Sequence, residues 1–132
     1  MKRVISLGGI FFKSKNPAAL REWYAKHLEF DIQDWGCKFD WRTPDADTGE
    51  AYTVWSPFRE DTLYFDPSPK QFMLNLVVHD LIALLEQLKL EGVTVLAEPE
   101  ESEFGKFGWI LDPEENKIEL WEPPKKGNAS AN

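Results

Sequence analysis

The chain has 132 residues, of which 42% are hydrophobic, enough to bury the core of one compact domain. Its 23 acidic and 15 basic residues give a formal net charge of -8, and apart from the pair Lys125–Lys126 the basic residues form no cluster. This charge repels phosphate backbones and anionic lipid, so we expect neither nucleic acid nor a membrane as a partner.

The first half of the chain predicts a strand, a helix and three further strands. Val4–Lys13 is rich in β-branched and aromatic residues, which favour a strand. Asn16 is a suitable N-cap and Pro17 a suitable first residue for a helix that runs to about Leu28. The further strands are expected at Phe30–Trp35, Cys37–Arg42 and Ala51–Ser56, with a polar loop at residues 43–50.

The second half repeats this order after a connector rich in Pro and Asp at Phe58–Lys70. It predicts a helix at Asp80–Glu91 that ends at Gly92. Its strands are expected at Phe72–Val78, Val93–Leu96, Phe107–Leu111 and Lys117–Glu122. The acidic run Glu98–Glu103 is expected to be a solvated loop, with a lid over a cleft as the alternative.

The two halves match at a fixed offset of 64 residues. Ile10–Phe12 corresponds to Leu74–Leu76 at the first strand, and Thr53–Trp55 corresponds to Lys117–Glu119 at the last strand. Such a duplication predicts an α+β fold of two tandem βαβββ modules, at about 1–66 and 67–123, whose strands form a curved mixed sheet around a cleft. We expect one domain over 1–123, a flexible tail over 124–132, and a ligand between the modules.

Two segments resemble the vicinal oxygen chelate superfamily, which includes glyoxalase I, bleomycin-resistance proteins and extradiol dioxygenases. The first segment is Phe11–Pro17 with Trp23–Leu28, and the second is the hairpin Asp112–Leu120, where Glu115 replaces the usual Gly. The resemblance covers Val4 to Pro123. It implies a small-molecule ligand, and it implies modules paired within one chain or between two, from which we expect a homodimer.

The resemblance also implies four positions at which metal-dependent members of the superfamily carry ligands for a divalent ion. These positions fall at Gly9, Trp55, Met73 and Glu119. Only Glu119 has a suitable donor, and one carboxylate holds such an ion weakly. The usual metal site is therefore expected to be missing, and no cofactor is predicted.

Strand alternation predicts the rest of the cleft lining. If Glu119 faces the cleft, side chains two residues away on the same strand face it too. The candidate ligand-binding residues are Phe11, Trp41, Thr53, Trp55, Met73, Asn75 and Trp121. This lining suits a planar or largely apolar molecule that stacks on aromatic rings and is oriented by Asn75 and Glu119.

Several of these residues have an alternative structural role. Glu119 could pair with a basic residue in the fold, although a carboxylate between Ile118 and Leu120 on a buried strand is costly without a use. The aromatic candidates could simply fill the core.

Cys37, the only cysteine, cannot form an intramolecular disulfide. Met1–Arg3 leads into a strand without an apolar leader, so a cytoplasmic location is the default expectation.

Two function classes stay open from the sequence. One is a metal-free protein that binds a small, partly aromatic molecule. The other is a lyase, isomerase or dioxygenase relative that uses Glu119 as a catalytic general base, or as one ligand of an atypical metal site. The missing metal ligands favour the first class or metal-free chemistry.

Overall fold

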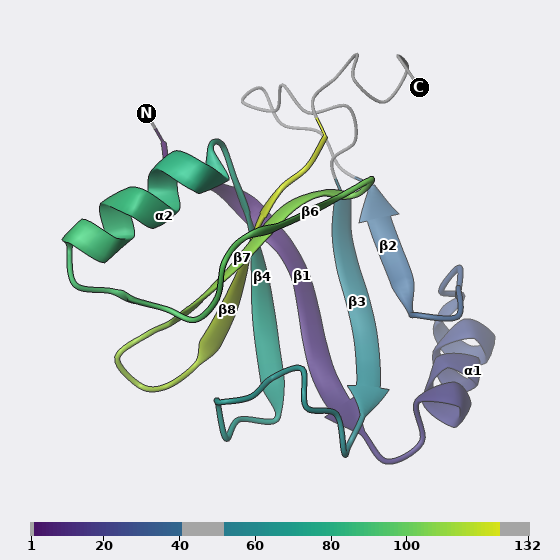
Figure 1. The fold of residues 1–132 in the computed structure, drawn as a ribbon. Coiled ribbons are helices and arrows are strands. Elements are labelled where there is room, and N and C mark those ends of the chain that lie inside the picture. The colour runs from purple at the N-terminus through teal and green to yellow at the C-terminus, as the bar shows by residue number, and fades with distance from the viewer. Residues whose placement is uncertain (1, 41–51, 125–132) are drawn as a thin grey trace.

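The structure is a computed structural model that describes residues 2–40 and 52–124. These residues form an eight-stranded sheet in the order β2-β3-β1-β4-β8-β7-β5, with β6 paired to β7 (Figure 1). The strands are β1 (Val4–Ser14), β2 (Cys37–Asp40), β3 (Tyr52–Arg59), β4 (Phe72–Val78), β5 (Thr94–Val95), β6 (Glu100–Ser102), β7 (Gly105–Leu111) and β8 (Lys117–Glu122). The helices are α1 (Pro17–Leu28) and α2 (Leu81–Leu90).

The two halves of the chain pair in the same way. β1 runs parallel to β3, and β4 runs parallel to β8. β1 and β4 are antiparallel neighbours at the centre of the sheet and join the halves. The predicted α+β class with a curved mixed sheet is confirmed, whereas the module boundary near residue 66 stays a prediction.

The first helix begins at its predicted cap, and the second begins one residue after its predicted start, with Asp80 as the cap. The Asn16 side chain accepts a hydrogen bond from the Ala19 amide at 3.1 Å, and Pro17 follows at the first helical position. Asp80 accepts from the Ala83 amide at 3.2 Å in the same way. Figure 1 shows α1 and α2 at opposite ends of the sheet, with β1 and β4 between them. Neither helix is long and apolar enough to cross a bilayer, within the described residues.

The main core lies beneath α2. The buried residues that pack together there come from β4, α2 and β8, and they are Val78, Leu81, Leu84, Leu85 and Leu120. α1 packs less deeply, because none of its residues is buried and Trp23 is 51% exposed. Most of the buried packing between helix and sheet therefore lies in the second half of the chain.

The predicted strand at Phe30–Trp35 is wrong. Only an isolated bridge between Gln33 and Gly36 forms there, closed by two backbone hydrogen bonds of 2.7 and 3.1 Å. Gly36 has φ of 142°, and any side chain there would collide with the Trp55 carbonyl, so the chain turns tightly into β2. The Phe30 ring packs on Tyr24 and Trp55 instead of continuing a strand.

Other predicted boundaries shift. The acidic segment expected to be a loop contains β6, which pairs with β7 and keeps its side chains exposed. β3 continues past Ser56 to Arg59. The predicted loop at 43–50, the residues Trp41, Arg42 and Ala51, and the tail from Lys125 onward lie outside the described residues.

The turn between β7 and β8 fixes the register of the last hairpin. Asp112 accepts hydrogen bonds from the amides of Glu114 and Asn116, both at 2.9 Å, and from the Asn116 side chain at 2.7 Å. These bonds from Asn116 hold the pKa of the Asp112 carboxyl below its usual value. Glu115 takes a left-handed φ of 66°, the conformation that explains why Gly is common at this position in the resembling hairpin. The hairpin then places Trp109 opposite Glu119.

Candidate functional site

A cavity of about 440 Å³ is lined by side chains of β1, β3, β4 and β8 together with residues of β2 and the β6–β7 hairpin. Its lining residues are Gly8, Phe11, Trp35, Lys38, Tyr52, Val54, Asn75, Phe104, Phe107, Glu119 and Trp121. The cavity is large enough for a small organic molecule. Aromatic rings make up most of its wall.

The cavity and the helices lie on opposite faces of the sheet. On β8, Ile118 and Leu120 pack toward the core under α2, while Glu119 and Trp121 line the cavity. On β4, Asn75 pairs with Glu119 across the parallel strands and faces the same way. Strand alternation therefore assigns adjacent residues to two separate tasks.

Trp121 is the most firmly held part of the wall. Its indole N–H donates to the Phe104 carbonyl at 2.7 Å, and the side chain is almost completely buried. The Phe107 ring lies nearly parallel to the indole, with ring centroids 6.2 Å apart, and the Tyr52 ring approaches it at 5.3 Å. A flat ligand would meet preformed ring faces here.

Glu119 forms the polar floor of the cavity and is only 3% exposed. Its Oε1 accepts from Asn75 Nδ2 at 2.6 Å. Its Oε2 accepts from Trp109 Nε1 at 2.9 Å and from the Tyr64 hydroxyl. Three donors from three different segments thus compensate the burial of this carboxylate.

Tyr64 comes from the segment between β3 and β4, which folds back toward the start of β8. Lys117 Nζ holds this segment by donating to the Tyr64 carbonyl at 2.5 Å. Burial raises the pKa of the Tyr64 phenol, and the nearby charge of Glu119 raises it further. The phenol therefore stays protonated and donates to the carboxylate. Burial also lowers the pKa of Lys117, against the opposing attraction of Glu119.

Asn75 leaves one buried acceptor without a partner. Its side chain is 3% exposed, and its Oδ1 has no hydrogen bond among the described residues. Because a carboxylate only accepts, the Asn75 amide must present its NH₂ group to Glu119, and Oδ1 then lies beside Gly8. An orphaned buried carbonyl costs about 1–3 kcal/mol.

The structure brings four of the predicted site residues to the cavity and leaves three away from its wall. Phe11, Asn75, Glu119 and Trp121 line it. Thr53 and Trp55 point to the opposite face of the sheet, and Met73 shares the cavity face but is fully buried, so none of the three is among the lining residues. A role for them in ligand binding stays a prediction. Trp41 lies outside the described residues.

The error on β3 is one of register. The 64-residue offset aligned Trp55 with Glu119. In the structure the row of paired residues that crosses the sheet from Glu119 passes through Asn75 and Gly9 and reaches Val54, one residue before Trp55. A slip of one residue turns every side chain to the other face, so Tyr52 and Val54 line the cavity. Trp55 packs instead on the Tyr24 ring of α1, with centroids 4.4 Å apart.

Thr53 and Met73 have other surroundings. The Thr53 hydroxyl donates to the Leu7 carbonyl at 2.9 Å, which ties β3 to β1. Met73 lies two residues from Asn75 on β4 but is fully buried beneath other side chains. It supports the sheet below the wall of the cavity.

Sequence reasoning found Asn75 but missed Trp109 and Tyr64, the other two residues that hold Glu119. Trp109 could have been found, because the predicted hairpin with its turn at residues 112–116 places it opposite Glu119. Tyr64 lies in an irregular connector, and no periodicity indicates its direction. Phe104 and Phe107 were missed because the acidic run before them indicated a solvated loop.

The residues present do not fit a divalent metal ion. The other three positions implied by the superfamily carry Gly9, Trp55 and Met73, which offer no oxygen or nitrogen ligand suited to such an ion. In the observed register Val54 and Asn75 lie in one row with Glu119, and of these two only Asn75 offers an oxygen. N–H and O–H donors already point at both carboxylate oxygens, where a cation would have to approach. No group of three or more His, Cys, Asp or Glu residues suited to a metal occurs in residues 2–40 and 52–124.

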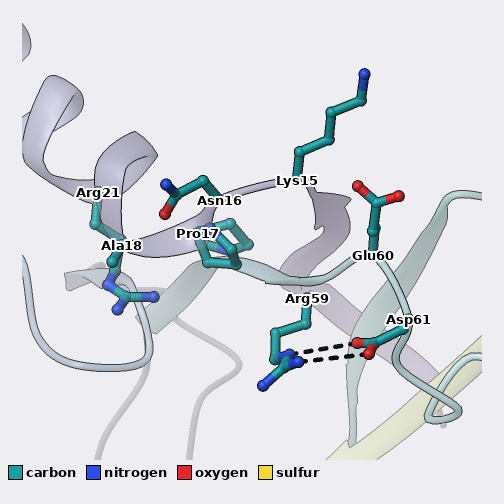
Figure 2. Close-up of a pocket in the computed structure, with 9 residues that line it drawn as sticks. Lys15, Asn16, Pro17, Ala18, Arg21, Arg59, Glu60 and Asp61 are labelled. Carbon is teal, nitrogen blue, oxygen red and sulfur yellow. Dashed lines mark hydrogen bonds and ion pairs between the residues drawn. The ribbon is translucent and has the colours of Figure 1, made fainter.

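A second hollow, at the start of α1, does not form a comparable site. It has a volume of about 660 Å³, and charged residues such as Lys15 and Arg21 lie around it. Figure 2 shows the Arg59 guanidinium engaged by Asp61, with contacts of 3.3 and 3.4 Å. The Asn16 side-chain oxygen is used to cap the helix. The polar groups around this second hollow are therefore solvated or already paired.

Comparison with known proteins identifies the family to which this chain belongs. The model of the family described as a glyoxalase-like domain matches residues 9–121. No curated protein matches the chain.

Several solved structures share the fold. A variant methylmalonyl-CoA epimerase from Streptomyces coelicolor has a TM-score of 0.68 at 15% identity, with 91% of this chain and 98% of that chain covered. The methylmalonyl-CoA epimerase from Mycobacterium tuberculosis has a TM-score of 0.62 at 19% identity, covering 100% and 95%. The Mn(II)-bound glyoxalase from Novosphingobium aromaticivorans has a TM-score of 0.59 at 17% identity, covering 96% of this chain and 42% of that chain. These identities establish a common architecture and no common activity.

The Tyr64–Glu119 contact predicts a loss of stability at alkaline pH. Because the pKa of Tyr64 is raised in the folded state, its stabilising contribution is complete below the unfolded value of about 10 and falls as pH rises above it. The free energy of unfolding should therefore drop more steeply above pH ~10 in the wild type than in Tyr64→Phe. Urea denaturation across this range measures both slopes, with Tyr24→Phe as the matched control. Equal slopes for wild type and Tyr64→Phe would contradict the assignment.

The donor set around Glu119 predicts the metal content. Protein purified without chelator should carry no stoichiometric Zn, Ni, Fe or Mn by elemental analysis, and adding these ions should produce no glyoxalase I activity. A transition ion coordinated by Glu119 and two further protein side chains would overturn this expectation.

Proposed function

Because the chain belongs to the glyoxalase-like domain family of the vicinal oxygen chelate superfamily, we propose that it binds a small, partly aromatic molecule without the superfamily's usual metal. The ligand lies in the cavity between β3 and β8. Tryptophan and phenylalanine side chains provide the stacking surfaces, and Asn75 and Glu119 orient the ligand at the floor.

One observation carries this proposal: the buried pair Asn75–Glu119 lies at the floor of a cavity whose wall is otherwise largely aromatic. Three donors already hold the carboxylate in one orientation. A polar floor fixed in this way is preorganised, so a ligand does not have to pay for ordering it.

The same carboxylate supports an alternative function. Among the described residues, Glu119 Oε1 accepts one hydrogen bond, so a lone pair is left that could receive a proton from a substrate. In this alternative the protein is a lyase, isomerase or dioxygenase relative with Glu119 as general base. The binding function is favoured because donors from Asn75, Trp109 and Tyr64 already occupy the carboxylate.

Binding should depend on Trp121. Aromatic compounds that enter the cavity should quench tryptophan fluorescence, and Trp121→Ala should weaken their binding by about 1 kcal/mol or more through lost stacking. Trp23→Ala is the matched control, because Trp23 is 51% exposed on α1 and lies away from the cavity. If no compound from a chemically diverse aromatic set binds the wild type, the cavity has no such use.

Glu119→Gln then separates the two functions for any compound that binds. A catalytic base is lost in this variant, so turnover should vanish while affinity is kept. A binding protein shows no turnover in either form and changes only in affinity. Circular dichroism and urea denaturation show whether the variant still folds, since the amide cannot accept all three hydrogen bonds.

The assembly proposed here is a homodimer. Half-exposed apolar residues lie in a row on β1 and β4, on the helix-bearing face between α1 and α2. Val4, Leu7, Ile10 and Phe72 are each between 36% and 40% exposed. α1 packs mainly on β3, and α2 on β5, β7 and β8, so this row is left for a symmetric partner.

Light scattering should therefore give a dimer mass at tens of micromolar. Ile10→Lys should shift the protein toward the monomer, because it places a charge in the apolar row. Ile82→Lys is the matched control, since Ile82 is also 40% exposed but lies on α2. A monomeric wild type would refute the proposed assembly.

A further inference from the structure

We infer that the cavity selects planar aromatic or heteroaromatic molecules that carry an amino group at their buried end, and that it discriminates against aromatic carboxylates. This inference rests on the proposed binding function and adds the chemical class of the ligand. Its basis is the polarity of the atoms at the floor of the cavity.

Within residues 2–40 and 52–124, the floor offers acceptors, and its side-chain donors are already used. The Asn75 NH₂ group, the Tyr64 hydroxyl and the Trp109 indole N–H all point at Glu119. What the pair Asn75–Glu119 has left is the orphaned Oδ1 of Asn75 and one lone pair on Glu119 Oε1. A ligand group that donates two N–H bonds would satisfy both atoms.

The orientation of Asn75 is fixed by its neighbours. Turning the amide over would aim its oxygen at the Glu119 carboxylate, where two acceptors would repel each other. Gly8 leaves the space that Oδ1 occupies, because a Cβ there would lie 2.1 Å from this oxygen. A larger residue at position 8 would therefore displace the amide.

Charge around the cavity favours the same ligand. Of the two charged side chains among the described lining residues, Glu119 is buried. Lys38, the basic residue of the lining, is exposed and already contacts Asp40 at 3.7 Å and the Tyr52 ring at 4.7 Å. A carboxylate at the floor would meet two oxygen acceptors and a like charge, without a donor to compensate its desolvation.

The size of the cavity limits the ligand to a few fused rings. A volume of about 440 Å³ accommodates a bicyclic aromatic molecule with a small substituent. The parallel Phe107 and Trp121 rings provide flat contact surfaces above the polar floor. The amino group would point toward Asn75 and Glu119 while the ring stacks on the wall.

Three bicyclic compounds of the same ring shape test this selectivity. Isothermal titration calorimetry at pH 7.5 would compare 3-aminoquinoline, quinoline and quinoline-3-carboxylate with the wild-type protein. We expect 3-aminoquinoline to bind at least about tenfold more tightly than quinoline, because it satisfies the orphaned acceptor. The carboxylate should bind most weakly.

Two variants test whether the preference for the amino compound depends on the floor of the cavity. Asn75→Leu removes the acceptor and Gly8→Ala displaces it, so each should reduce the preference for the amino compound from about tenfold to less than about twofold. Gln71→Leu, which removes an exposed side-chain amide, should leave the preference unchanged. If either variant fails to fold, the three compounds on the wild type still decide the question.

The outcomes distinguish the inference from the proposed function. Quinoline or its carboxylate binding as tightly as 3-aminoquinoline would overturn the inference while the aromatic cavity keeps its function. A preference that survives both Asn75→Leu and Gly8→Ala would also overturn it. Absence of binding by all three compounds would count against both the selectivity and the proposed function.

Discussion

The arrangement of this molecule depends on the hydrogen bonds to one buried carboxylate. Glu119 on β8 accepts from Asn75 on β4, from Trp109 on β7 and from Tyr64 in the connector that follows β3. A charged group buried at 3% exposure is tolerated only with such compensation. The same bonds join the centre of the sheet, its last hairpin and the crossing connector.

This compensation also determines what the cavity can recognise. Among the described residues, the side-chain donors of Asn75, Trp109 and Tyr64 are directed at Glu119. A ligand would therefore encounter acceptors at the floor and aromatic rings elsewhere. A metal ion is disfavoured for the same reason, because the space it would need is occupied by N–H and O–H groups. The fold is shared with epimerases and a glyoxalase, whereas the chemistry of this floor belongs to the side chains of this chain.

Much of the fold could be predicted from the sequence, because capped helices and a duplicated strand pattern are local signals. The helix start at Pro17 and the strand at Phe72–Val78 agree with the structure, and the second helix starts one residue after the predicted Asp80. The cavity was harder to predict, since its walls depend on pairing between distant strands. A repeat offset does not fix strand register, which is why Trp55 was assigned to the wrong face and Val54 was overlooked. Tyr64 could not be predicted, because an irregular connector has no periodicity.

The two faces of β8 have a consequence for how such a protein can diversify. Ile118 and Leu120 contribute to the packing under α2, whereas Trp121 lines the cavity on the other face and is as deeply buried as the core residues. Substitutions at wall positions change the shape offered to a ligand and do not touch the packing under α2. At a buried wall position such as Trp121 they also leave a void that lowers stability. Recognition can therefore change at least cost through the half-buried wall residues Phe107 and Val54. Trp121 is restricted by its burial, and Glu119 by the three hydrogen bonds that hold it on the cavity face.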